Sequence, residues 1–489
     1  MVLNGLGFTN RALYLTRLFF RDKPVNRLIG KGIEAEHLND DVLGRSLDAI
    51  YEYGPEMLYP QLAVPALKHL DLSSRFGHLD STSFHTEGQY NSREEPQEGV
   101  IHRTSGYSRD HRPDLNQVVL QLICERQAGI PLLMEPLNGN NSDKTSFRDM
   151  INAHIDQMHT DFRLEYVVAD SALYTAETLQ DMQTIFWISR VPETLSLASD
   201  IIHLIVPELM SQPDQSAFRS LGTVYSNVKQ RWVVVYSPAA YQRALKTVNK
   251  QCLKQSTAEQ SAFDKLCKQE FANETDARKA LAAFEKTQKM TSVTDVQVTA
   301  LPRYNSKGRP ARDRQPDFYV YRIQGSIASN LASMPRRLER KSCFILATNQ
   351  LDCEALSDEE LIAAYKDQQK VERGFRFLKD PLFMASTLFL ESPKRIMALM
   401  MVMTLCLLVY AALEYRIRTV LKTHHETFPN QKAQPIDNPT ARWVFQYFSG
   451  IHVLIIAKMK ELVLNLNEHH WSLLRLLGKR YELLYSGTG

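Results

Sequence analysis

The sequence lacks the cysteine patterns of zinc modules and of disulfide-rich secreted proteins. Its six cysteines form no C-x-x-C pair and no short cluster with histidine. This spacing favours reduced, mostly buried thiols, which are typical of a cytoplasmic protein. The adjacent pairs His424-His425 and His469-His470 do not suggest a metal site, because neighbouring residues on a helix do not share a face.

An excess of either charge is also missing. The chain has 58 Lys and Arg against 55 Asp and Glu, a net charge of +3. The overall charge therefore neither requires nor excludes nucleic acid, and any basic surface must come from local clusters. The N-terminus has no signal-peptide pattern and no lipidation motif.

Long apolar runs are absent except for residues 396–413, in which Thr404 is the one polar residue. At 18 residues this run reaches only the lower limit for crossing a membrane. It is rich in Met and Ala and has basic residues on both sides, so a helix buried in a large core explains it as well, and we favour that interpretation.

Short β-branched or apolar runs predict an α/β fold built on a mixed sheet. Three expected strands are followed by a helix, a strand, a helix and a strand, an order typical of one mixed sheet. The five strands are expected within residues 75–84, 118–126, 130–138, 164–172 and 184–192, and the first helix within 142–158. A further buried strand is expected at 342–349.

Residues from about 195 to 335 interrupt this order and predict an insertion. They contain a ribbon at 223–238, a charged helical stretch at 258–288, and two strands around a basic loop within 296–323. The expected regions are a helical N-terminal region (1–70), the first part of the core (71–195), the insertion (196–335), the second part of the core (336–420) and a helical C-terminal region (421–489).

Three carboxylates occupy places where catalytic residues are common. Asp80 lies in or at the end of the first strand and Asp170 ends the fourth, where a rigid scaffold passes into loops. Glu372 lies on a helix expected from the capping box at Ser357 to the stop at Pro381. In such a helix Tyr365, Glu372 and Lys379, spaced by seven residues, share one face.

If the two strands are neighbours, the three acids converge, and their mutual repulsion calls for cations. Two Mg²⁺ ions, or Mn²⁺, about 4 Å apart would meet this need and would support phosphodiester displacement. The alternative is coincidence among 55 acidic residues, with Glu372 an ordinary surface residue paired with Arg376.

Several segments occur in an order that resembles one family of enzymes. They are "GHLDSTSFHTEGQY", "GYSRDHRPDLNQVVLQL", "GNNSDKTSF", "YVVADSALY", "FWISRVP" and the helix that carries Tyr365, Glu372 and Lys379. Over roughly residues 2–486 the chain resembles the DDE transposases of bacterial insertion sequences, in the IS-four superfamily. The resemblance implies an RNase H-like catalytic domain, with a β-rich insertion in the 202 residues (372 − 170) between Asp170 and Glu372.

The resemblance also implies an activity. Asp80, Asp170 and Glu372 would be the catalytic, metal-binding acids of an enzyme that cleaves DNA strands at the ends of an insertion sequence and joins them to target DNA. A homodimer on double-stranded DNA, in the cytoplasm of a bacterium or archaeon and associated with the nucleoid, is implied as well. The alternative is an inactive or truncated copy that binds DNA without cleaving it, because the chain opens at a point that resembles the middle of the family's N-terminal region.

The family signature has an arginine three residues after the tyrosine, where this chain has Gln368. The resemblance assigns Tyr365 and Lys379 to phosphate contacts. The candidates to replace the missing arginine are Lys366, Lys370, Arg373 and Arg376, each of which could equally be a solvated charge on the helix. Whether hairpin intermediates form is left open by this departure.

Two further DNA contacts are expected in the insertion. Trp232 could stack on a flipped base, as an aromatic residue does in related transposases, although a place in a hydrophobic strand face is the interpretation we favour. Lys307 and Arg309, beside Gly308 and Pro310, could enter a minor groove, or could belong to a solvated turn.

Overall fold

The computed structural model describes most of the chain and divides it into two compact units. The described residues are 2, 6, 15–86, 97–106, 112, 114–211, 216–305, 315–330, 334–380, 387–388, 390–456 and 460–486. Unit 1 comprises residues 1–190, 223–231 and 348–489, and unit 2 comprises residues 191–222 and 232–347. Lys307 and Arg309 lie outside the described residues.

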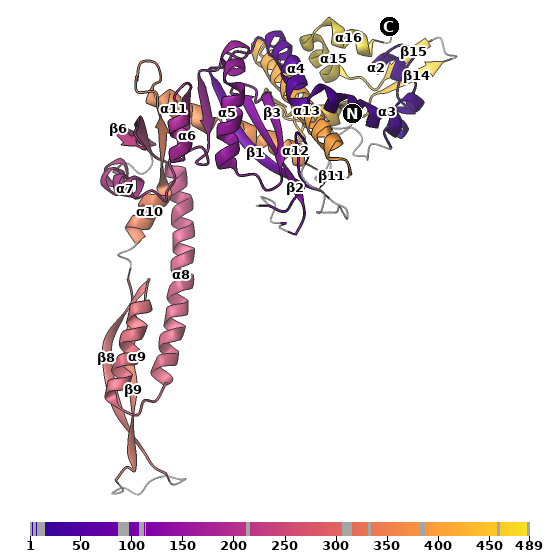
Figure 1. Cartoon of the computed structure of the whole chain (residues 1–489). Coiled ribbons are helices and arrows are strands. Elements are labelled where there is room, and N and C mark those ends of the chain that lie inside the picture. Colours follow the sequence, from indigo (N-terminus) through magenta and orange to yellow (C-terminus); the bar gives the residue numbers. More distant parts are fainter. Residues whose placement is uncertain are drawn as a thin grey trace. The chain divides into compact units, whose positions relative to one another are not determined.

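Unit 1 is built on a sheet whose strands follow the order β3-β2-β1-β4-β5 (Figure 1). β1, β2 and β3 pair antiparallel, whereas β4 and β5 run parallel to β1. The strands are β1 (Phe76–Thr86), β2 (Gln117–Glu125), β3 (Pro131–Asn138), β4 (Tyr166–Ala169) and β5 (Phe186–Arg190), and the short β11 (Thr387–Leu388) pairs with β1. This is the RNase H-like arrangement, so the predicted fold class is confirmed.

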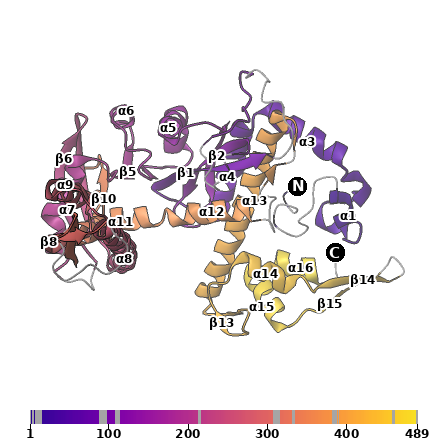
Figure 2. The same ribbon diagram turned by 90° about the horizontal axis from the view of Figure 1, so that it is seen from below.

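Helices cover both faces of this sheet (Figure 2). α5 (Asp143–Thr160) and α6 (Ala176–Asp181) lie on one side, and α11 (Asp358–Lys366) and α12 (Gln369–Lys379) lie on the other. Side chains alternate between faces along a strand. Ser81 therefore donates a hydrogen bond to Asp143 of α5 (2.5 Å), while its neighbour Asp80 points to the side of α11 and α12.

The apolar run seen in the sequence forms α13 (Pro393–Thr423), the central helix of unit 1. It packs against α12, β3 and two N-terminal helices, α3 (Asp40–Tyr53) and α4 (Pro55–His69). Its most apolar window is 72% buried within the protein. Gly374 of α12 faces Leu407 of α13 so closely that an added Cβ would lie 3.0 Å from the leucine side chain. The length and hydropathy of this helix are thus accounted for by the core.

The two ends of unit 1 are mainly helical. The N-terminal part adds α1 (Thr16–Phe20), α2 (Val25–Leu28) and the 3-10 turn η3 (Ala35–His37), and the C-terminal part has α14 (Ala441–Phe448), α15 (Glu468–Leu477) and α16 (Lys479–Tyr485). The C-terminal part also contains two hairpins that the sequence did not lead us to expect. They are β12 (Phe428–Pro429) with β13 (Pro435–Ile436), and β14 (His452–Ile456) with β15 (Lys460–Leu464).

A β-hairpin spans the boundary between the units, as predicted for residues 223–238. It consists of β6 (Ala217–Tyr225) and β7 (Val228–Tyr236). Its turn residues Ser226 and Asn227 both have positive φ, 52° and 61°, as a two-residue hairpin turn requires.

Unit 2 contains a long helix beside a long ribbon. α8 (Pro238–Lys268) packs on β9 (Phe318–Ser329), which pairs antiparallel with β8 (Thr291–Arg303). α9 (Glu274–Thr287) lies against the same ribbon, and α7 (Ser196–Leu209), α10 (Met334–Ser342) and β10 (Cys343–Thr348) complete the described elements. The helical stretch expected at 258–288 is therefore two helices, because Asn273 caps the N-terminus of α9 by accepting a hydrogen bond from the N–H of Asp276.

Candidate active site

Asp80 lies in β1, and Asp170 directly follows β4, the parallel strand that neighbours β1. In the ladder between β1 and β4, His78 is paired with Val168. Two residues further along the same register, Asp80 is level with Asp170, and adjacent strands are about 4.8 Å apart. Each carboxylate is also fixed by a nearby backbone N–H: Asp80 accepts from Ser81 (2.8 Å) and Asp170 from Ala172 (2.9 Å).

Arg190 extends this row to a third strand. Ala169 of β4 is paired with Ser189 of β5, so the next position of the register places Arg190 level with Asp170. Arg190 lies in the segment FWISRVP, but nothing in the sequence around it predicts a role in the site. A single arginine at a strand end forms no local pattern, and only the register of three parallel strands shows that it adjoins the two aspartates.

The predicted single helix over residues 358–380 is wrong, because the structure has two helices. α11 ends at Lys366 and α12 begins at Gln369, with a turn at Asp367 and Gln368 between them. The N–H of Lys370 bonds to the C=O of Asp367 (2.9 Å), three residues back, which marks the tightened backbone of the break. Tyr365 therefore lies on α11, whereas Glu372 and Lys379 lie on α12.

Contacts of Gln368 with β1 stabilise the turn between the two helices. Its side chain bonds to β1 and does not project into solvent. It is 8% exposed, and its Nε2 donates a hydrogen bond to the C=O of Leu79 (3.0 Å). Its Oε1 lies 2.9 Å from Nδ1 of His78. An amide oxygen can only accept, so Nδ1 carries the proton. We call these contacts among Gln368, His78 and Leu79 the Gln368 bridge.

The surroundings of His78 keep the bridge neutral. Burial lowers the pKa of His78 to about 4, so its imidazole is uncharged near neutral pH. Leu79 directly precedes Asp80, and the C=O of Gln368 accepts a bond from the N–H of Glu372 (3.3 Å). The Gln368 bridge thus joins the backbone next to one acid to the helical turn that carries another.

A second set of contacts fixes the other side of the break. Asp367 pairs with Arg126, which follows β2, at 2.7 Å and with Lys370 at 3.3 Å. Burial raises the pKa of Asp367, but the hydrogen bonds and charges of these two cations outweigh burial, and its pKa is lowered. Lys370 also donates to the C=O of Arg126 (2.7 Å). Asp367 is therefore held by Arg126 just after β2, and the adjacent Gln368 is held by β1.

Glu372, Arg376 and Lys379 form the polar side of α12. Glu372 is exposed, and Arg376 lies 3.6 Å from it, with the two side chains 51% and 76% exposed. Such a solvated pair is worth about 0–1 kcal/mol, so it does little to restrain either group. The Nζ of Lys379 lies 6.0 Å from the centre of the Phe84 ring of β1.

The electrostatics of Tyr365 show that the three acids share one neighbourhood. Burial is the main reason why the pKa of this hydroxyl is raised. Three carboxylates raise it further, and they are Asp170, Glu372 and Asp80. The charge of Arg190 acts in the opposite direction. One hydroxyl is thus within electrostatic range of all three predicted acids and of the arginine that the sequence analysis missed.

The site offers oxygen ligands of the kind that Mg²⁺ and Mn²⁺ prefer. Within the described residues, no three His, Cys, Asp or Glu side chains are grouped closely enough to ligate one ion. Asp80, Asp170 and the exposed Glu372 carry the carboxylate oxygens that a hard cation prefers. The three carboxylates are therefore ligands of the type that Mg²⁺ or Mn²⁺ would need.

Trp232 lies in the core, as the interpretation that we favoured from the sequence predicts. Its side chain is 0% exposed, in a β7 strand that is almost entirely buried. A ring without exposed surface cannot stack on a base in this conformation, so the structure does not support the base-stacking alternative.

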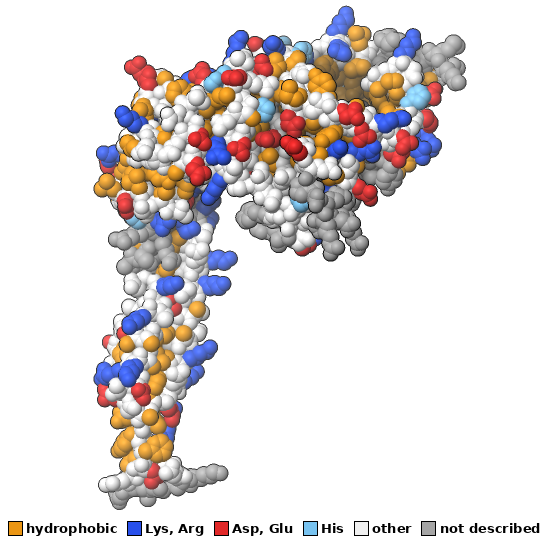
Figure 3. All heavy atoms as spheres, in the orientation of Figure 1, with side chains coloured by type: hydrophobic (Ala, Val, Ile, Leu, Met, Phe, Trp, Pro, Cys, Tyr) orange, Lys and Arg blue, Asp and Glu red, His pale blue; other side chains and the backbone are white. Residues whose placement is uncertain are grey.

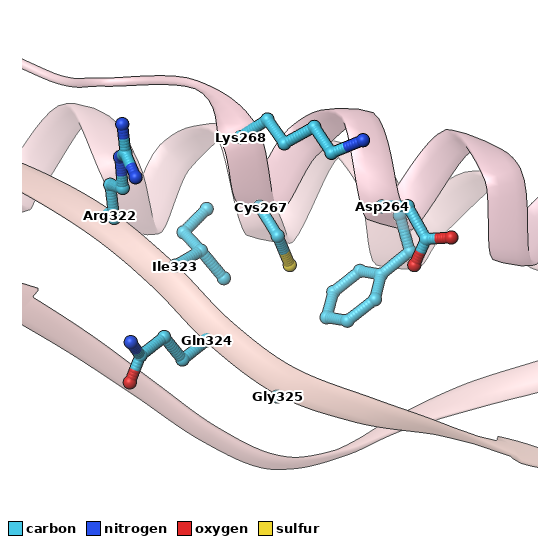
Figure 4. A pocket seen from close by; sticks show the side chains of 8 residues that line it. Asp264, Cys267, Lys268, Arg322, Ile323, Gln324 and Gly325 are labelled. Atoms are coloured by element: carbon cyan, nitrogen blue, oxygen red, sulfur yellow. The ribbon is translucent and has the colours of Figure 1, made fainter.

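An open hollow in unit 2 lacks the features of an active site. Figure 4 shows it between the end of α8 and β9, with Asp264, Cys267, Lys268 and Arg322 among its lining residues. Burial raises the pKa of the Cys267 thiol, which makes it a poor nucleophile. Arg322 is paired with Glu270. This hollow therefore contains no set of groups suited to the chemistry of the three acids.

Comparison with known proteins gives matches over most of the sequence. Residues 72–409 match the family described as transposase DDE domain, and residues 1–64 match a domain of unknown function, DUF4277. No curated protein matches the chain.

Two transposase structures are among the solved structures that the chain resembles. A piggyBac transposase synaptic complex with hairpin DNA is 7% identical, with a TM-score of 0.34, over 87% of this chain and 67% of the other. A Mos1 transposase paired-end complex with the left transposon end is 10% identical, with a TM-score of 0.17, over 30% of this chain and 43% of the other.

Proposed function

The chain belongs to the transposase DDE domain family, and on that premise we propose that it cleaves DNA at the ends of an insertion sequence and transfers the cleaved strands to target DNA. The observation that supports this proposal is the position of Asp80 in β1 and of Asp170 just after the neighbouring parallel strand β4, together with the effect of both acids and of Glu372 on the Tyr365 hydroxyl. Membership of the IS-four superfamily is part of the proposal.

Asp80, Asp170 and Glu372 would hold the divalent ions, which we propose to be two Mg²⁺, with Mn²⁺ as a substitute. When bound, such ions activate the attacking oxygen and stabilise the leaving oxygen of a phosphodiester. The chain itself fixes the two aspartates by the register of β1 and β4 and by the N–H groups of Ser81 and Ala172. It holds the backbone at Glu372 through the start of α12 and leaves the side chain exposed.

The cationic and hydroxyl groups around the acids would position the scissile phosphate. Arg190, level with Asp170, supplies a fixed positive charge beside two negative ones. Tyr365 stays protonated, because its pKa is raised, and can donate a hydrogen bond to a phosphate oxygen. Lys379 and Arg376 follow Glu372 on the exposed side of α12 and would contact the strand beyond the cleaved bond. Gln368 would not contact the DNA strand, because its side chain is buried and hydrogen-bonded to β1.

The partners of this chemistry would be double-stranded DNA at the element's ends and at the target. We propose that two copies of the chain pair the two ends, because joining both ends to one target requires two sets of acids. The protein would act as a soluble enzyme on the DNA of a bacterial or archaeal cell.

The test is cleavage of a labelled duplex that carries the DNA flanking this gene, in the presence of Mg²⁺ or Mn²⁺. The variants Asp80→Asn, Asp170→Asn and Glu372→Gln keep the shape of each side chain and remove its charge. We expect each of them to reduce cleavage to background while duplex binding in EDTA stays within a few-fold of the wild type.

Glu359→Gln is the matched control, because Glu359 is an exposed acid in the first turn of α11. It should cleave like the wild type. Wild-type rates in all three site variants would overturn the assignment of the acids. Binding without cleavage by the wild type at every metal concentration would favour an inactive copy.

A further inference from the structure

One side of α8 carries an uninterrupted row of basic residues. Arg243, Lys246, Lys250 and Lys254 are spaced by three or four residues, and all four are exposed. At about 100° per residue they fall within an arc of about 80° on the helix surface. We call these four residues the α8 basic stripe. Figure 3 shows Lys and Arg side chains following α8 along its exposed edge.

The stripe is not neutralised by its own helix. α8 has no acidic residue before Glu259. Glu259 lies on the opposite side of the helix, where its carboxylate accepts bonds from the N–H groups of Lys289 (3.0 Å) and Met290 (3.2 Å). Within the described part of the chain, no ion pair involves any residue of the stripe. Four positive charges of one helix face are thus presented to solvent.

The opposite face of α8 is committed to the interior of unit 2. Its buried residues include Ala244, Val248, Phe263 and Leu266. They lie roughly 100–200° around the helix from Arg243. A helix that binds a membrane surface needs an apolar face beside its basic one. The large hydrophobic side chain that α8 exposes is the single Leu253, 70% exposed, which does not make such a face. The stripe therefore suits a partner that is bound by charge alone.

We propose that the α8 basic stripe binds the phosphate backbone of double-stranded DNA without reading its sequence. From Arg243 to Lys254 the helix rises about 16 Å, a length over which one strand of a duplex carries about five phosphates. Beyond Lys254 this face continues with the uncharged Thr257 and Ser261 and then with the acid Asp264 beside Lys265 and Lys268, so the uncompensated charge is confined to the four residues of the stripe. This inference rests on the proposed function, to which it adds a DNA-holding surface outside the acids.

The neighbouring helix provides a contrast within the same unit. α9 carries three basic residues and three acids, so its surface has no excess of either charge. Its Arg278 pairs with Glu274 (2.6 Å). Arg278, Lys279, Lys286 and the following Lys289 form a control set of one arginine and three lysines, which matches the stripe in number and type. Neutralising either set removes the same net charge.

The experiment measures how the affinity of the full chain for a 30-base-pair duplex of arbitrary sequence depends on salt, in EDTA so that no cleavage occurs. The stripe variant is R243Q/K246Q/K250Q/K254Q, and the control variant is R278Q/K279Q/K286Q/K289Q. Each phosphate contact contributes about 0.9 to the slope of log K against log salt concentration, so loss of the stripe should reduce the slope by about 3–4. The control should change it by less than about 1.

Equal slopes in the two variants would overturn the inference and would point to an acidic protein as the partner of the stripe. Circular dichroism should show equal helix content, because Gln, Lys and Arg have similar helix propensities. Cleavage in Mg²⁺ separates this result from the proposed function. A chain that cleaves but has equal slopes refutes the stripe alone, and a chain that never cleaves but has a stripe-dependent slope refutes the enzyme alone.

Discussion

We predict that the buried side chain of Gln368 affects the cleavage rate through the Gln368 bridge, without contacting DNA. In Gln368→Ala, the C=O of Leu79 and the Nδ1–H of His78 lose partners at 3.0 and 2.9 Å. A buried polar group left unpaired costs about 1–3 kcal/mol, so the variant should lose about 2–6 kcal/mol of stability. The two lost hydrogen bonds would also leave the backbone beside Asp80 and the first turn of α12 less firmly held.

The kinetic consequence follows from the position of the bridge. A shift of about 1 Å at a reacting group can reduce a rate about 10²-fold, so we expect the single-turnover cleavage rate to fall roughly 10–100-fold. Affinity for duplex DNA in EDTA should not change, because Gln368 is only 8% exposed. Gln369→Ala is the control, since Gln369 is its exposed neighbour on the same turn.

A double-mutant cycle separates the bridge from a general loss of packing. Urea unfolding of Gln368→Ala, His78→Ala and the double variant should give a coupling energy of about 0.5–3 kcal/mol. Additive unfolding energies, or a wild-type cleavage rate in Gln368→Ala, would refute the reasoning. A matching loss of DNA affinity would also refute it, because it would mean that the side chain faces the substrate.

Three further predictions concern other parts of the protein. Arg190→Ala should reduce single-turnover cleavage about 10²-fold while leaving DNA affinity within a few-fold, and unchanged rates would remove Arg190 from the site. Burial, with Glu56 and Asp149 nearby, raises the pKa of Glu135 to about 7. The folded state therefore holds this proton more tightly than the unfolded chain, and stability falls as pH rises from about 4.5 to 7. Glu135→Gln should raise the free energy of unfolding by on the order of 1–3 kcal/mol at pH 8 and by little at pH 4.5, and equal effects at both pH values in urea titrations would contradict this. Trp232→Ala should cost about 3–5 kcal/mol, whereas Trp232→Phe should keep wild-type DNA affinity, and weaker binding by a stable Trp232→Phe would restore the base-stacking role.

Sequence patterns predicted the strands of the sheet and the acids Asp80 and Asp170, because the signals for a strand and its end are local. Apolar and β-branched runs predicted one strand with Asp80 in it or at its end and another that ends at Asp170. In the structure Asp80 lies within β1, which continues to Thr86, and Asp170 directly follows β4. The pairing of β1 with β4 is the step that a single sequence does not contain. Arg190 was missed for the same reason, since its relation to Asp170 exists only in the sheet.

The break between α11 and α12 could not be predicted from helix signals. A helix cap precedes residue 358, and apolar residues continue at helical spacing through residues 358–380. No glycine or proline marks the turn at Asp367 and Gln368. The turn depends on partners more than 200 residues away, Arg126 on one side and His78 on the other. Long-range side-chain contacts outweighed local helix propensity here.

The distance along the chain between Asp170 and Glu372 has a consequence during synthesis. At about 5–20 residues per second, a ribosome needs roughly 10–40 s to add the 202 residues (372 − 170) that separate the two acids. Throughout that interval the growing chain has Asp80 and Asp170 but not Glu372, and it has no Gln368 bridge to hold β1. A chain released after Lys254 and before Glu372 would carry the α8 basic stripe and two of the three acids. On the proposed roles, such a product of interrupted synthesis would bind DNA and would not cleave it.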